Sequence, residues 1–352
     1  MIICPTCSGT DCIRPAEDVL DSIYQMYMAC PKCPPEPGWD KQAPLTALLH
    51  RDTADKNTLL CSACGRRPLD AVMGHVLTIM LEHGDREADA GLAQVGTPLI
   101  SCGFPIMYPP RLGKGDLVLI ADDVQPGTAE DIVDRVPEVR GVVLRAGEQA
   151  QSVGILDPDS GPHEYTLLAG CDMRCDVAQT SLGELVIYKS QSRIHIEFPR
   201  ESGHKMNVLG QLDIEGLLAG RVVVDGMCGP GTLGLMSVLM GAGKVILNDA
   251  WRPAIENVLL NLEVNKEILG VEVEQLEPIG NMPLIGHEPV LAAKAVRGNN
   301  TVAEVYFGDI SLLADTVDDC DICLIDTFPA ADPSEYVRIW KNKFSGVNVI
   351  VI

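Results

Sequence analysis

Residues 221–265 read RVVVDGMCGPGTLGLMSVLMGAGKVILNDAWRPAIENVLLNLEVN, which predicts a strand, a glycine turn, a helix and a second strand ending in acid. The opening run, Arg221–Val224, is rich in the β-branched residues that fill buried parallel strands, and Asp225 closes it. We expect the helix over Thr232–Met240 and the second strand over Lys244–Leu247. This arrangement is typical of a nucleotide-type cofactor site.

The glycines and one acid sharpen this expectation. Gly229, Gly231 and Gly234 follow the strand as G-x-G-x-x-G, a spacing that lets the backbone turn sharply and approach a ligand. Asp249 stands at the tip of the second strand, where a carboxylate can accept hydrogen bonds from both ribose hydroxyls. Asp225 would repel a pyrophosphate but suits the ammonium group of S-adenosylmethionine, so that cofactor is favoured over NAD.

Two further strands are expected downstream, each followed by an acid. AEVYFGDI brings Gly308 and Asp309 to the end of a third strand, and DICLIDTFP ends a fourth strand at Asp326. Together these segments resemble the class I S-adenosylmethionine-dependent methyltransferases. The segment NDAWRPAIENVLLNLEVN resembles the second motif of archaeal transfer-RNA methyltransferases.

The resemblance assigns a role to each motif. Asp225, Gly226, Gly229 and Gly231 would hold the methionine end, Asp249 the ribose and Asp309 the adenine. Asp326 and Phe328 would border the methyl acceptor. Upstream, the order of GDLVLI, EYTLLAG and CDMRCDV resembles the tRNA guanine-37 N1-methyltransferase family, in which a small α/β domain precedes the catalytic one. The similar region runs over residues 111–352.

Two features depart from that family. Members that methylate a nitrogen carry N/D-P-P-Y/F after the fourth strand, whereas this chain has Asp326, Thr327, Phe328 and Pro329. The last segment, GVNVIVI, is expected to be the fifth strand of a sheet ordered 3-2-1-4-5, where the family has two more strands. An apolar edge of this kind needs cover, so we expect a second copy, another subunit or the N-terminal part to lie against it.

The charge balance limits the partners. The formal net charge is −22, from 27 basic and 49 acidic residues, which disfavours binding to a phosphate backbone. The basic stretch 188–205 is a local exception, readable as an anion seat or as a solvated hairpin. The sequence has no signal-peptide pattern and no long apolar run, so we expect a cytoplasmic protein with no membrane partner.

Cysteines are concentrated at the N-terminus. Of 13 cysteines, seven lie in the first 64 residues, and three C-x-x-C pairs predict thiolate ligation of a metal. The pairs are Cys4 with Cys7, Cys30 with Cys33, and Cys61 with Cys64. The first two pairs would bind one tetrahedral zinc ion as a zinc ribbon. The third pair would then belong to a second site, or it would replace the second pair as the partner of the first. An iron–sulfur cluster is the alternative to zinc. Cys171 and Cys175 are read mainly as packing residues.

These segments divide the chain into four parts. We expect a cysteine-rich zinc-binding module at 1–70, a helical linker at 71–110, a small α/β domain with a hairpin at 111–205 and the cofactor-binding Rossmann-like domain at 206–352. The expected function is S-adenosylmethionine-dependent methyl transfer to a protein side chain or a small cofactor precursor. A tRNA base as acceptor and a non-catalytic cofactor-binding subunit remain the alternatives.

Overall fold

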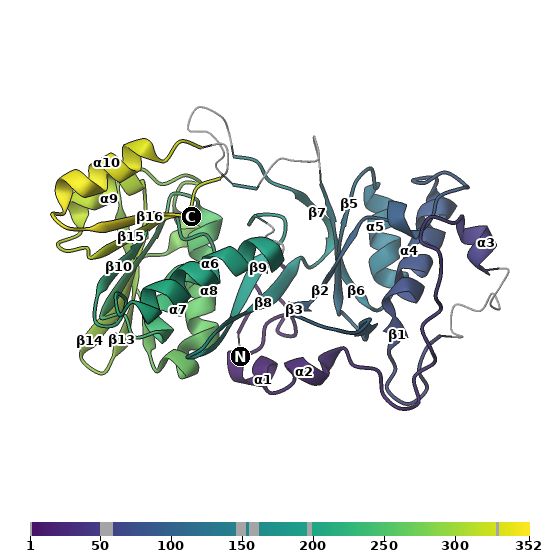
Figure 1. Cartoon of the computed structure of the whole chain (residues 1–352). Coiled ribbons are helices and arrows are strands. Elements are labelled where there is room, and N and C mark those ends of the chain that lie inside the picture. Colours follow the sequence, from purple (N-terminus) through teal and green to yellow (C-terminus); the bar gives the residue numbers. More distant parts are fainter. Residues whose placement is uncertain (1, 50–58, 146–152, 155–161, 196–198, 329–330) are drawn as a thin grey trace.

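The computed structural model describes residues 2–49, 59–145, 153–154, 162–195, 199–328 and 331–352. Its largest element is a mixed sheet near the C-terminus, on the left of Figure 1. Within the described residues this sheet has seven strands in the order β12-β13-β14-β11-β10-β15-β16. Their bounds are β10 Val222–Asp225, β11 Lys244–Asp249, β12 Glu272–Gln275, β13 Val290–Arg297, β14 Asn300–Phe307, β15 Ile322–Ile325 and β16 Asn348–Val351.

The five parallel strands β14-β11-β10-β15-β16 have the expected order 3-2-1-4-5. The sequence reading missed the antiparallel pair β12 and β13, which extends the sheet beyond β14. The parallel strands are joined by helices α7 Thr232–Leu239, α8 Arg252–Leu269, α9 Ile310–Thr316 and α10 Ser334–Lys343. The Rossmann-like α/β fold that we expected is therefore confirmed.

Side chains that alternate along the strands pack into two layers. Val223 and Leu247 lie in a core with α7 and α8, together with helix α6 (Pro199–Ile214). Val224 and Ile246 point into a second core, which contains α9 and the fully buried Trp340 of α10. Both faces of the parallel strands are thus covered, as their continuous apolar runs require.

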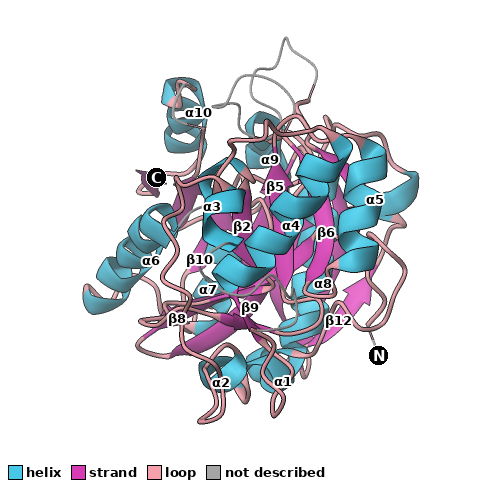
Figure 2. Ribbon diagram, turned by 90° about the vertical axis from the view of Figure 1, so that its right-hand side faces the viewer, coloured by secondary structure: helices cyan, strands magenta, loops and turns pink. Residues whose placement is uncertain are grey.

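A smaller sheet forms the other lobe, on the right of Figure 1. Its order is β2-β5-β6-β7, and the helices α4 and α5 lie over it in Figure 2. The bounds are β2 Thr97–Ile100, β5 Leu117–Ala121, β6 Val139–Leu144, β7 Thr166–Gly170, α4 Leu69–His83 and α5 Pro126–Arg135. The stretch 71–110, expected as a linker, contains most of α4 and contributes β2 to the sheet by pairing with β5.

A third sheet, β3-β8-β9, lies between the two lobes in Figure 1. It consists of β3 (Cys102–Gly103) and the hairpin of β8 (Met173–Thr180) and β9 (Gly183–Ser190). The hairpin ends at Ser190, and Lys205, the expected end of the small α/β domain, lies in α6.

The hairpin is joined to the domain of the seven-stranded sheet by asparagines of α8. Asn261 accepts a hydrogen bond from Tyr188 N–H (2.7 Å) and donates to the Tyr188 carbonyl (2.9 Å). Asn265 makes the same pair of contacts with Val186, at 2.9 and 2.8 Å. The three asparagines, Asn257 included, recur every four residues and so face β9 along one side of the helix.

The N-terminal part contains short helices α1 (Ala16–Leu20), α2 (Ile23–Met26) and α3 (Leu45–Leu49) and the strand pair β1 (Arg67–Pro68) and β4 (Arg111–Leu112). Helix α1 packs against α8 and β9, so this part is not a separate body. Among the described residues no helix is long and apolar enough to cross a membrane. Strand β16 pairs only with β15 within the described residues; the expected cover for its outer edge stays a prediction.

Candidate functional site

The glycine turn lies at the carboxyl end of β10. Gly229 has φ of 51° and Gly231 has φ of 87°, backbone conformations that other residues rarely adopt. A Cβ on Gly234 would stand 2.7 Å from the Leu247 side chain, so only glycine lets α7 approach β11 this closely. These glycines therefore permit the sharp turn that the sequence predicted, and their contact with a ligand stays a prediction.

Asp225 is fully buried at the end of β10. Its Oδ2 accepts a hydrogen bond from Gly234 N–H (2.8 Å), whereas its Oδ1 has no partner among the described residues. Burial, aided by repulsion from Asp326, raises the pKa of Asp225 to about 7. A buried carboxylate oxygen without a donor fits a cationic group of a ligand.

Asp249 ends the neighbouring strand β11. Its Oδ2 accepts from Gly229 N–H (2.9 Å) and its Oδ1 from Trp251 N–H (2.8 Å), which fixes the carboxylate beside the glycine turn. Loss of hydration raises the pKa of Asp249 to about 6, although these two hydrogen bonds oppose the shift. Each oxygen keeps a further lone pair, so the carboxylate can still accept from a ligand hydroxyl.

Asn248 was not singled out in the sequence reading. Its buried amide donates to the carbonyls of Gly226 and Gly308, both at 3.0 Å, and so joins the loops after β10 and β14. Its Oδ1 and the Thr232 hydroxyl oxygen are buried without a hydrogen-bond partner among the described residues. The sequence signal that could have identified Asn248 is its position directly before Asp249, the acid expected to contact the ribose.

Asp309 follows β14, as expected, and caps helix α9. Its Oδ1 accepts from Ser311 N–H (2.7 Å), and its own N–H donates to the His287 carbonyl (2.8 Å). The side chain therefore has a local structural role, and the adenine contact stays a prediction.

Asp326, expected to border the methyl acceptor, lies directly after β15. Lys205 of α6 forms an ion pair with the Asp326 carboxylate, and both side chains are mostly buried. Phe328 meets His195 edge to face, with ring centroids 5.6 Å apart, and it also lies against Gly154. Lys205 and His195 belong to the basic stretch 188–205, and the structure places them beside Asp326 and Phe328. Pro329 lies outside the described residues.

The basic stretch 188–205 does not present a set of free cations in the part that the structure describes. Lys189 is buried and lies 3.5 Å from Asp176. Arg193 bonds to Glu164 (3.3 Å) and Glu256 (3.1 Å). With Lys205 paired to Asp326, the expected anion seat is not formed by these three side chains.

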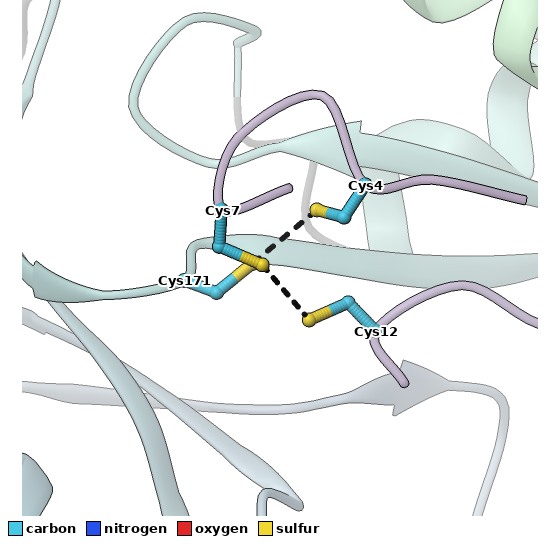
Figure 3. Close-up of side chains that lie close together, drawn as sticks. All are labelled: Cys4, Cys7, Cys12 and Cys171. Carbon is cyan, nitrogen blue, oxygen red and sulfur yellow. Dashed lines mark hydrogen bonds between the residues drawn. The ribbon is translucent and has the colours of Figure 1, made fainter. Parts of the chain in front are cut away.

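The cysteines form two groups, and the expected pairing was wrong. Cys30 and Cys33 lie with Cys61 and Cys64, whereas Cys4 and Cys7 lie with Cys12 and Cys171 (Figure 3). In each group all four sulfurs lie within 4.8 Å of one another. The fold returns the residue after β7 to the N-terminal turn, a contact across 167 positions that spacing alone does not reveal.

Cys102, Cys175 and Cys228 lie outside the two groups. Cys175 lies in β8, the strand that follows Cys171, and contacts Cys102 with the sulfurs 3.0 Å apart; both are buried. Cys228 is buried in the glycine turn, in keeping with a packing role.

No family model matches the chain, and a comparison with curated proteins found no match. Among solved structures, it is similar to wild-type Trm5b from Pyrococcus abyssi (14% identity, 66% of this chain, 56% of that chain, TM-score 0.38). It is also similar to the tRNA m1G37 methyltransferase of M. jannaschii (13%, 73%, 57%, 0.35). A third is Trm1 from Pyrococcus horikoshii in complex with S-adenosyl-L-methionine (18%, 50%, 42%, 0.36).

The chain therefore spans little more than half the length of the first two structures. At these TM-scores the likenesses carry no weight for activity, which must be argued from the site. The order of the five parallel strands is the one that the sequence resemblance led us to expect.

Proposed function

We propose that this chain is an S-adenosylmethionine-dependent methyltransferase. The observation that carries the proposal is the unpartnered, buried Oδ1 of Asp225 beside the glycine turn. Four neighbouring parallel strands each have an acid at or just after the carboxyl end. In sheet order these acids are Asp309, Asp249, Asp225 and Asp326. Ligands of open α/β sheets bind outside the carboxyl ends of the strands, where the strand order reverses, here between β10 and β15.

The negative charge at the carboxyl ends of these strands determines which kind of cofactor would bind. Asp326 raises the pKa of both Asp225 and Asp249, and Asp249 raises that of Asp225. A pyrophosphate would therefore be repelled here, whereas an ammonium and a sulfonium would be attracted. Asp225 with the backbone at Gly226, Gly229 and Gly231 would hold the methionine end. Asp249 would accept from the ribose hydroxyls. Bound S-adenosylmethionine would supply an electrophilic methyl group.

Little further chemistry is required of the protein itself. In such a transfer the catalytic gain comes mainly from aligning the acceptor with the methyl group and excluding water. Asp326, held by Lys205, and Phe328, held by His195, would form the acceptor side. Pairing with Lys205 reduces the ability of Asp326 to attract a cationic acceptor.

The acceptor that we favour is a protein side chain or a small cofactor precursor. The support is the net charge of −22 and the ion-paired state of Lys189, Arg193 and Lys205. A tRNA base is the alternative. Affinity for bulk tRNA that falls steeply between low and physiological salt would favour tRNA; absence of such binding would favour the other acceptors.

Two measurements test the cofactor and the reaction. Calorimetry should give micromolar-range binding of S-adenosylhomocysteine and no binding of NAD; binding of NAD alone would overturn the proposal. Radiolabelled methyl transfer to extract fractions treated with nuclease or protease should then identify the acceptor class. Tight cofactor binding without transfer to any fraction would instead support a non-catalytic cofactor-binding subunit.

The group of Cys30, Cys33, Cys61 and Cys64 would bind one structural zinc ion. Four thiolates at this spacing suit tetrahedral zinc. The backbone N–H groups of Cys64 and Ala63 point at the Cys61 sulfur and lower the pKa of that thiol to about 6. Metal analysis of the Cys64→Ser variant tests the site, since it should contain one zinc ion fewer than the wild type.

A further inference from the structure

We propose that Cys4, Cys7, Cys12 and Cys171 bind a second zinc ion, which fastens the N-terminal segment to the turn between β7 and β8. Three ligands come from the first 12 residues, and the fourth follows the last strand of the small sheet (Figure 3). The site is separate from the group of Cys30, Cys33, Cys61 and Cys64 and does not depend on the proposed methyl transfer.

The sulfur positions fit a single tetrahedral ion. The Cys4 and Cys171 sulfurs are 3.6 Å apart, and those of Cys7 and Cys12 are 3.3 Å apart. With zinc–sulfur bonds of about 2.3 Å, a tetrahedral site holds its sulfurs about 3.8 Å apart. An iron–sulfur cluster spreads its thiolates over several iron atoms with sulfides between them, so a group this compact favours one ion over a cluster.

The turn that carries the first pair recurs in the other cysteine group. Cys4 N–H donates to the Gly9 carbonyl (2.9 Å), and Ser8 N–H donates back to the Cys4 carbonyl (2.9 Å). Cys61 N–H likewise donates to the Arg66 carbonyl (3.0 Å), and Gly65 N–H to the Cys61 carbonyl (2.8 Å). The same loop thus presents a C-x-x-C pair to two further cysteines in both places.

The backbone of the two turns agrees as well. The fifth residue of each has a left-handed conformation, with φ of 57° at Ser8 and 67° at Gly65. For serine this conformation is costly, so the surrounding turn must impose it. A metal ion held by the pair explains why the strained turn is kept.

The fourth ligand stands on a rigid frame. Asp172, next to Cys171, is fully buried and accepts hydrogen bonds from Ser190 Oγ (2.7 Å) and Ser192 N–H (2.8 Å) of the segment that ends the hairpin. Its other oxygen accepts from Thr6 Oγ1 (3.1 Å), which lies between Cys4 and Cys7. Both residues after β7 therefore reach the same N-terminal turn.

The third ligand is held from the same side. Arg140 of β6 donates to the Cys12 carbonyl (3.4 Å) and to the Met173 carbonyl (3.0 Å), so one guanidinium bridges the two segments that the ion would join. Because the site is preorganised in this way, zinc binding requires little rearrangement, and its free energy contributes to folding of the N-terminal segment.

Metal content of single variants tests the site. The wild type purified without chelator should contain two zinc ions per chain. Cys171→Ser should contain one, Cys64→Ser should contain one, and the double variant none. Cys175→Ala, which alters a neighbouring buried cysteine outside both groups, should keep two. Two ions in Cys171→Ser, or iron with sulfide in the wild type, would overturn the proposal.

A second measurement does not require a folded variant. Native mass spectrometry of the wild type should show two ions on the folded chain, and stepwise chelation followed by hydrogen exchange should release residues 2–14 and 171–173 together. A Cys4–Cys171 or Cys7–Cys12 disulfide in freshly purified protein would show that the four thiols do not share an ion. Loss of metal with unchanged exchange at both segments would contradict the fastening role.

Discussion

Lys205 of α6 forms an ion pair with Asp326 at the carboxyl end of β15, so a helix that precedes the sheet neutralises one of its clustered acids. The same lysine also lowers the pKa of Asp225, against the larger effect of burial. Asp225, Asp249 and Asp326 thus have one lysine, Lys205, among them. Under the proposed function, the protonation of these acids would make cofactor binding depend on pH.

Replacing Lys205 should therefore weaken the binding of a cationic cofactor at neutral pH. In Lys205→Met, Asp225 keeps its proton to a higher pH, so the pH midpoint of S-adenosylmethionine binding should move upward. A one-unit rise from a pKa of about 7 would give about a fivefold loss of affinity at pH 7. Lys205→Arg is the matched control and should stay within about twofold of the wild type. Calorimetry over pH 6–8 measures both; equal midpoints in the two variants would remove Lys205 from the site.

The raised pKa of Asp225 also predicts how stability depends on pH. An unfolded aspartate titrates near pH 4, whereas folded Asp225 titrates near 7, so the folded state holds the extra proton between these values. The stabilising contribution is full below about pH 4 and is lost as the pH rises to about 7. Its steepest slope is about 1.4 kcal/mol per pH unit.

Asp225→Asn should accordingly have a flatter profile in this window. Urea unfolding at intervals from pH 5 to 8, with zinc present throughout, compares it with the wild type. Asp318→Asn alters an exposed acid before β15, at the other end of the sheet, and should reproduce the wild-type slope. Parallel profiles for all three proteins would refute the assignment.

Asp249→Asn tests the ribose contact. The substitution keeps the size of the side chain and one acceptor oxygen but removes the charge, so the hydrogen bonds expected from two ribose hydroxyls should weaken. We expect at least a tenfold loss of S-adenosylhomocysteine affinity, about 1.4 kcal/mol. Calorimetry with adenosine alone, which keeps the ribose, should show a similar fold-change; a loss seen only with the full ligand would point to the methionine end instead.

Much of the cofactor half could be predicted because it depends on local sequence. The strand, turn and helix at 222–239 and the acids after β11, β14 and β15 follow from hydrophobic runs and glycine spacing within short segments. The strand order 3-2-1-4-5 could also be predicted, because it is the order in the family that these motifs resemble. Strands β12 and β13 were missed although Gly298 and Asn299 form a two-residue turn between β13 and β14, which is a typical hairpin signal.

Contacts between distant segments could not be predicted in this way. Cys171 joins Cys4, and Lys205 joins Asp326 across 121 positions, only because the hairpin and α6 are packed where they are. The charge state of the basic stretch could not be predicted for a related reason: Arg193 and Lys189 have acidic partners from other elements, which a window of 18 residues does not contain.

Gly234 and Gly229 should respond differently to substitution by alanine. A Cβ at Gly234 would clash with Leu247 and crowd Asp225 Oδ2, so Gly234→Ala should disturb both the packing of α7 and the carboxylate, with a loss of stability of about 1–3 kcal/mol. Gly229 has open space around it and only an unfavourable φ, so Gly229→Ala should cost about 1 kcal/mol. Urea unfolding compares the two, and a larger loss in Gly229→Ala would contradict the packing argument.

The last prediction concerns the asparagines of α8. Their side chains form the hydrogen bonds to the β9 backbone that a neighbouring strand would otherwise form. Asn261→Ala would leave the Tyr188 N–H and carbonyl without their partner, together with the Pro230 carbonyl of the glycine turn. Unsatisfied buried groups cost about 1–3 kcal/mol each, so Asn261→Ala should lose about 2–4 kcal/mol, whereas Glu263→Ala on the same helix, a partly exposed position, should lose less than about 0.5 kcal/mol. Since Asn261 also holds the glycine turn, its loss should weaken cofactor binding. Urea unfolding and calorimetry on the two variants decide this, and a stability loss with unchanged cofactor affinity would confine Asn261 to docking the hairpin.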